Sequence, residues 1–96
     1  MGKYELIRPI EIDGKEVKTL EYDFESLTGN DIQEMNKELA RLGFQVGIAE
    51  LDMNYHAAFF AKAAGIAFED IGRLNAKDYN KVVTMVRDFF LSDATE

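Results

Sequence analysis

The sequence contains no cysteine and no tryptophan, and it has one proline and one histidine among its 96 residues. Without cysteine the chain cannot form disulfides, and thiolate sites for structural zinc or iron–sulfur clusters are excluded. A reducing compartment therefore suits the protein. No apolar run approaches the roughly 18 residues that would span a bilayer, and the amino terminus lacks the apolar segment of a secretory signal. We expect a cytoplasmic protein.

Basic side chains are also scarce, with 11 lysines and arginines against 18 acidic residues and a net charge of −7. This charge repels nucleic-acid phosphates and anionic lipid headgroups, so we expect no nucleic acid partner and no membrane partner. Between Thr19 and Asn36 there is no basic residue. The acidic residues there are Glu21, Asp23, Glu25, Asp31 and Glu34. The stretch is either a docking face for a basic partner or a solvated strand edge and helix start.

Apolar residues, by contrast, are plentiful. They make up 47% of the chain, and charged residues make up 30%. These fractions are typical of a globular protein and differ from those of disordered chains. With no linker or repeat in the sequence, residues 1–96 are expected to form a single domain.

The first quarter of the chain has the alternating apolar pattern of β-strands. Asp13-Gly14 separates two such runs, and this dipeptide between alternating apolar residues is a strong indication of a hairpin. The pattern predicts an antiparallel hairpin over about residues 4–25. Pro9 has no N–H to donate to a ladder, so its backbone should face outward at an edge.

The register of this hairpin is harder to predict than its existence. A two-residue turn would place Leu6 opposite Glu21 and divide the apolar residues between the two faces. We therefore expect either a three-residue turn with Gly14 in the left-handed conformation or a bulge near Lys18.

After the hairpin the apolar spacing becomes helical. Helices are expected over about residues 30–42, 49–64, 68–73 and 76–91. The second is apolar nearly all round, which is typical of a helix that is central to its domain or is also covered by a partner. In the last helix we expect Asn75 as the cap, and Asp78 in the first turn suits the helix dipole. The fold class is α+β: an N-terminal antiparallel β-hairpin, three main α-helices and one short helical turn.

Residues that could carry chemistry are few. His56 follows Asp52 by one helical turn, and the pair is either an ordinary helix contact or the dyad of a small hydrolase. Ser26 and Ser92 do not lie in a nucleophile context. Of Glu50, Asp52 and His56, only the last two share a helix face, so no metal site is expected. We predict no catalytic residue and no cofactor, and hence a protein that is not an enzyme.

Large flexible and aromatic side chains are more numerous than a minimal helical layer needs, and surfaces rich in Met and Phe adapt to varied apolar partners. We therefore expect the first two main helices to provide a client-binding or self-association surface, and the protein to form homo-oligomers. The candidate residues are Met35, Leu39, Leu42, Met53, Phe59 and Phe60.

Several motifs occur in a characteristic order from about Tyr4 to Leu91. They are the strand and turn Leu6–Val17, the helix start Thr28–Ile32, the segment Ala63–Ile66, the helix start Leu74–Tyr79, and the ending Phe90-Leu91. In this order and spacing the chain resembles the small tail assembly chaperones of contractile-tailed and related bacteriophages.

The resemblance implies a phage or prophage protein of the bacterial host cytoplasm that binds the tape measure protein. It would keep the apolar helical segments of that protein soluble during tail morphogenesis. A longer form made by translational frameshifting would recruit the tail tube protein. The family has no catalytic motif to transfer to this chain.

A different function remains open from the residues alone. An acidic inhibitor or immunity-type protein could bind a basic protein partner through the Glu21–Glu34 stretch. Binding led by charge weakens steeply with ionic strength, whereas apolar client binding does not.

Overall fold

A computed structural model of the chain describes residues 2–45 and 52–94. It begins with an antiparallel hairpin of strands β1 (Gly2–Ile12) and β2 (Lys15–Tyr22), followed by a single 3-10 turn, η1 (Phe24–Ser26). The helices are α1 (Gly29–Arg41), α2 (Met53–Ala64), α3 (Phe68–Ile71) and α4 (Ala76–Ala94). The expected α+β class, with a hairpin followed by helices, is confirmed.

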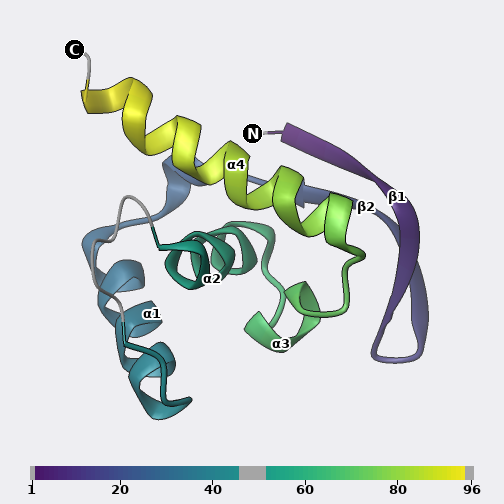
Figure 1. The fold of residues 1–96 in the computed structure, drawn as a ribbon, viewed down its shortest axis with the longest axis horizontal. Helices are drawn as coiled ribbons and strands as arrows, with labels where there is room; N and C mark the ends of the chain where they lie inside the picture. The colour runs from purple at the N-terminus through teal and green to yellow at the C-terminus, as the bar shows by residue number, and fades with distance from the viewer. Residues whose placement is uncertain (1, 46–51, 95–96) are drawn as a thin grey trace.

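Helix α2 lies at the centre of the molecule. It packs against α1, α3, α4 and β2 (Figure 1). Every residue from Tyr55 to Ala61 is buried. Its alanines, such as Ala57, allow the neighbouring elements to approach closely. The chain's own elements therefore account for the apolar character of this helix on all sides, as expected of a central helix.

The start of α2 differs from the prediction. The helix begins at Met53, because Asp52 is extended (φ −86°, ψ 119°) and its carboxylate accepts the N–H of Tyr55 at 3.0 Å. Asp52 is thus the N-cap and not a residue within the helix, as the predicted range of 49–64 would make it. Residues 49–51 of the predicted helix lie outside the described residues. At the other end, Gly65 stops the helix in the left-handed conformation (φ 71°), as expected.

The hairpin turn has two residues, so the three-residue turn, one of the two predicted alternatives, is wrong. Ile12 pairs with Lys15, and both Asp13 (φ 54°) and Gly14 (φ 78°) are left-handed. Two left-handed central residues are the signature of the tight turn that matches the twist of a hairpin. The left-handed conformation predicted for Gly14 is confirmed.

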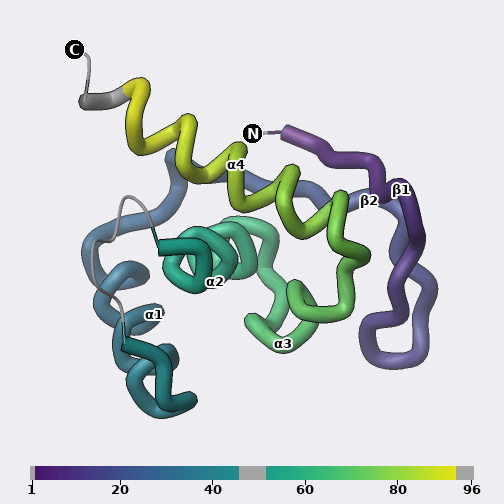
Figure 2. The backbone as a smooth tube through the Cα atoms, in the orientation of Figure 1, coloured from purple at the N-terminus to yellow at the C-terminus, as the bar shows by residue number. Residues whose placement is uncertain are grey.

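An irregularity in β1 reconciles this tight turn with the apolar pattern. Near the turn Ile10 pairs with Val17, whereas further along Glu5 pairs with Thr19. The four-residue segment 6–9 of β1 therefore lies opposite Lys18 alone, and β1 bends part of the way along its length (Figure 2). The predicted bulge near Lys18 is therefore present, but the extra residues are in β1, opposite Lys18, and not in β2.

The core joins the hairpin to the helices. Its largest fully buried apolar side chains are Phe60, Leu39, Ile71, Val82 and Val86. Leu20 of β2 and Ile10 of β1 belong to the same cluster. Within residues 2–45 and 52–94, no helix combines the length and apolarity needed to cross a membrane.

Candidate functional site

Four of the six residues predicted to form a client surface lie in the core, which corrects that prediction. Met35, Leu39, Phe59 and Phe60 are between 0 and 4% exposed. The physical reason is the central position of α2. Its two apolar faces and the inward face of α1 are covered by other elements of the same chain. A partner could not cover Leu39 or Phe60 without unfolding the helices around them. Met35 and Phe59 each line a surface hollow but expose no more than 4% of their surface.

The other two candidates remain accessible. Met53, in the first turn of α2, is 49% exposed, and Leu42, directly after α1, is half-buried. Their part in client binding stays a prediction.

His56 occupies an interior position. It is 2% exposed, and its ring lies 6.3 Å from that of Tyr55 and 6.2 Å from that of Phe90, measured between centroids. The carboxylate of Asp52 caps α2, which explains its presence one turn before the histidine. Among the described residues, no group of three or more His, Asp or Glu side chains is placed to hold a metal ion.

A hollow on the surface brings together aromatic side chains from three parts of the chain. It lies where η1 and the start of α1 meet α2 and the second half of α4, and we call it the aromatic pocket. Its apolar lining consists of Phe24, Leu27, Ile32, Phe59, Phe89 and Phe90, and Glu25, Thr28 and Gly29 complete it. In Figure 1 the connection between β2 and α1 passes beside the yellow half of α4.

The rings of the aromatic pocket contact one another. The centroid of Phe24 lies 5.3 Å from that of Phe89 and 5.6 Å from that of Phe59, and Phe59 lies 4.9 Å from Phe90. These separations are those of favourable ring pairs. Phe59 is buried and forms the floor, whereas the other three rings are half-buried.

Sequence reasoning missed this pocket, although one indication was available. Phe89 and Phe90 are adjacent, and successive residues of a helix point about 100° apart. Both rings therefore cannot occupy the same buried stripe, and one must lie at its border. The contribution of Phe24 depends on the path of the chain after β2, which no periodicity predicts.

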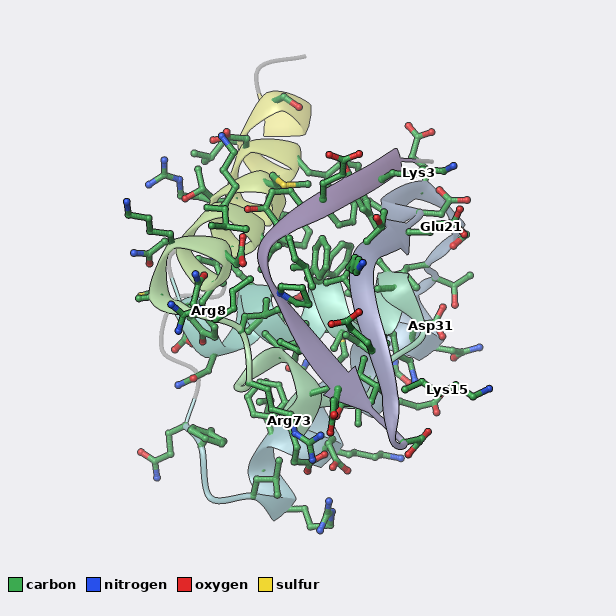
Figure 3. All side chains as sticks on the ribbon, turned by 90° about the vertical axis from the view of Figure 1, so that its right-hand side faces the viewer. Lys3, Arg8, Lys15, Glu21, Asp31 and Arg73 are labelled. Carbon is green, nitrogen blue, oxygen red and sulfur yellow. The ribbon has the colours of Figure 1, made fainter. Side chains whose placement is uncertain are left out.

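The acidic residues from Glu21 to Glu34 make different contacts within the chain. Lys3 lies 3.7 Å from Glu21 at the open end of the hairpin (Figure 3), and Lys62 lies 3.6 Å from Glu34. Asp31 accepts the backbone N–H of Thr28 at 2.8 Å at the start of α1. The helix-start interpretation thus holds for Asp31, and two of the other carboxylates face a lysine of the same chain. Glu25 is exposed and lines the aromatic pocket.

A second cluster centres on Asp78, which is 0% exposed, although the strand residues that it contacts are less buried. Its carboxylate accepts the hydroxyl of Tyr4 at 2.6 Å and the backbone N–H groups of Ile7 at 3.0 Å and Arg8 at 3.2 Å. Asn75 caps α4 by accepting the N–H of Asp78 at 2.8 Å. The carboxylate takes the place of a strand partner for the irregular part of β1.

These contacts shift two pKa values. Burial acts to raise the pKa of Asp78, but the hydrogen bonds from Tyr4, Ile7 and Arg8 favour the carboxylate, and the pKa is lowered overall. Burial, together with the hydrogen bond to Asp78, raises the pKa of Tyr4 to about 12. At neutral pH the pair is therefore a charged carboxylate and a neutral phenol. The Asp78 carboxylate accepts its hydrogen bonds from the backbone of β1 and from Tyr4. The cluster therefore connects α4 to β1 and leaves no acceptor position open for a substrate.

Comparison with known families shows a match over most of the chain. A family model described as phage tail assembly chaperone proteins, E, or 41 or 14, matches residues 3–91. No curated protein and no solved structure matches the chain. The matched range includes β1 from its second residue, all of β2, the aromatic pocket and the Asp78 cluster.

Proposed function

The chain belongs to the family of phage tail assembly chaperone proteins, and from this premise we propose that it binds the tape measure protein and keeps its apolar helical segments soluble during tail morphogenesis. The observation that carries the proposal is the family match over residues 3–91, which includes nearly the whole hairpin and most of α4. The proposal places the protein in the cytoplasm of the bacterial host.

Two physical properties support a holding function. The net charge of −7 keeps a complex with an apolar client soluble. The half-buried rings of Phe24, Phe89 and Phe90 provide apolar surface that a client could cover. We further propose homo-oligomers, and a longer frameshifted form that recruits the tail tube protein. Leu42 and Met53 remain proposed contact residues in either assembly.

The competing hypothesis, an acidic inhibitor of a basic protein, has less support. Its proposed face includes Glu21 and Glu34, which each lie within 4 Å of a lysine nitrogen of this chain, and Asp31 is engaged in capping α1. A face whose charges are partly offset internally attracts a basic partner less strongly.

Co-expression tests the proposed function. The chain is produced together with the tape measure protein encoded in the same phage or prophage, and the soluble fraction of the tape measure protein is measured. We expect this fraction to rise strongly with the chain, and to stay low with an unrelated acidic protein of similar size. A tape measure protein that stays insoluble with the chain would contradict the proposal. A complex that dissociates at about 0.5 M salt would favour the charge-led alternative.

A further inference from the structure

We propose that the aromatic pocket is the docking site for an amphipathic helix of the client, which inserts an apolar side chain into the hollow that the rings line and places lysine or arginine beside Glu25. The inference rests on the proposed function for the identity of the client. The location and the chemistry of the helix follow from the pocket itself.

The shape of the aromatic pocket suits a side chain better than a free metabolite. Its volume is about 420 Å³, and it is widely open to solvent. Ligand sites for small molecules enclose most of the ligand and combine apolar walls with several placed polar groups. Here the walls are aromatic and aliphatic, and the one charged side chain among the described lining residues is Glu25.

The pocket is also preformed. Its floor, Phe59, belongs to the central helix α2, and Phe89 and Phe90 stand on α4, which packs along α2. Phe24 is held against Phe59 and Phe89 from η1. Walls on packed helices lose little conformational entropy when a partner binds, and this favours a compact anchor residue. A helix presents such anchors at one face, one turn apart.

Charge indicates which residues flank the anchor. No lysine or arginine occurs between Thr19 and Asn36, and this stretch supplies the η1 and α1 side of the pocket. The positive end of the α1 dipole is offset by Asp31, whose carboxylate accepts the N–H and the hydroxyl of Thr28. Glu25 therefore has no lysine or arginine near it in the sequence. A lysine or arginine on the approaching helix would complement its negative charge.

The same charge argues against a second copy of the chain as the occupant. Each copy carries −7, so a second copy would meet Glu25 with a less favourable charge than a basic helix. The proposed homo-oligomers would use other surfaces, such as that of Leu42 and Met53. A partner helix with lysine or arginine next to its apolar anchor has the opposite sign. The proposal therefore commits to a basic amphipathic helix of a different protein.

The test uses the full chain and a fluorescent peptide of about 18 residues, long enough to form a helix. The peptide has leucines along one face and lysines beside them. Two comparison peptides replace the leucines by alanine or the lysines by glutamate. We expect anisotropy to detect binding of the first peptide and much weaker binding of the other two.

Variants of the chain locate the binding site. Glu25→Lys reverses the charge at the pocket, and Leu27→Ser removes one apolar wall. Glu11→Lys makes the same charge change on the exposed side of the hairpin near its turn. We expect the first two variants to weaken binding of the lysine peptide several-fold, and Glu11→Lys to bind like the unmodified chain. Thermal unfolding identifies a variant that has lost its fold, and Glu25→Lys, at an exposed site, keeps the test valid if Leu27→Ser unfolds.

Equal binding by Glu25→Lys, Glu11→Lys and the unmodified chain would overturn the inference. Sedimentation showing an oligomer of the unmodified chain that Leu27→Ser breaks up would overturn it as well, because a second copy would then occupy the pocket. Co-expression separates the two proposals. If the unmodified chain and Glu25→Lys solubilise the tape measure protein equally, the docking site is wrong and the proposed function stands. If neither does so while the peptide results hold, the proposed function fails alone.

Discussion

The carboxylate of Asp78 accepts the backbone N–H of Ile7 at 3.0 Å, across 71 positions of the sequence. The contact joins the first turn of α4 to the one part of β1 that has left the ladder of its hairpin. Irregular strands leave backbone donors without a partner, and a buried unpaired N–H is costly. Asp78 removes this cost for Ile7 and Arg8 together.

Replacing Asp78 by Asn should destabilise the fold by about 3 kcal/mol, because one acceptor oxygen becomes a donor that faces other donors. The free energy of unfolding, measured with urea, checks this. Asp88→Asn provides the control, since Asp88 stands on the exposed side of the same helix, 3.8 Å from Arg87. Such a surface pair contributes little, so a similar loss in both variants would contradict the role of Asp78.

The Asp78 cluster should also make stability depend on pH at both extremes. The folded pKa of Asp78 is lowered, so its contribution is present above the unfolded pKa and is lost as the pH falls through the folded value. Tyr4 is the opposite case. Its pKa is raised from 10.0 to about 12, so its contribution is complete below 10.0 and is lost as the pH rises toward 12.

Urea unfolding of Tyr4→Phe across this alkaline range isolates the second effect. Phenylalanine cannot ionise, so the variant should lose less stability between pH 10 and 12 than the unmodified chain, whose Tyr4 has a pKa of about 12. Parallel curves for the two proteins would show that Tyr4 does not titrate with folding.

Phe60→Asp should unfold the protein, and not merely abolish binding. Phe60 is 0% exposed at the centre of α2, and losing a buried Phe side chain costs about 3 to 5 kcal/mol even before a charge is buried. Circular dichroism measures the loss of helix. Met53→Asp, at a 49% exposed position of the same helix, should keep the spectrum, and a folded Phe60→Asp would contradict the core assignment.

The hairpin turn offers a test on the backbone alone. Gly14→Ala should destabilise the fold by about 1 kcal/mol, since Gly14 has φ +78° and no atom within 4 Å of an added Cβ. Gly29→Ala meets equally open space without a positive φ, and it should not destabilise. The midpoint of thermal unfolding compares the two. An equal shift for both variants would indicate that left-handed strain at Gly14 is absent.

Local chemistry is sufficient to predict most elements of this chain. The Asp13-Gly14 turn, the stop at Gly65 and the cap at Asn75 depend on residues within a few positions of one another, and each lies where the sequence indicates. The order of these motifs also indicates the family, because motif order is a property of the sequence and does not depend on how the elements pack.

The contacts that depend on distant residues could not be predicted in the same way. Both faces of α2 are largely apolar, so the pattern does not tell a side chain covered by α1 or α4 from one that meets a partner. For that reason the sequence predicts Phe59 and Phe60 at a surface, whereas both are buried. The sequence assigned Asp78 to the helix dipole, and packing adds the three donors of β1. The aromatic pocket likewise exists because η1 places Phe24 against Phe89, which lies 65 positions further along the sequence. Periodicity indicates which side of an element is apolar. Which element or partner covers that side depends on how the elements pack.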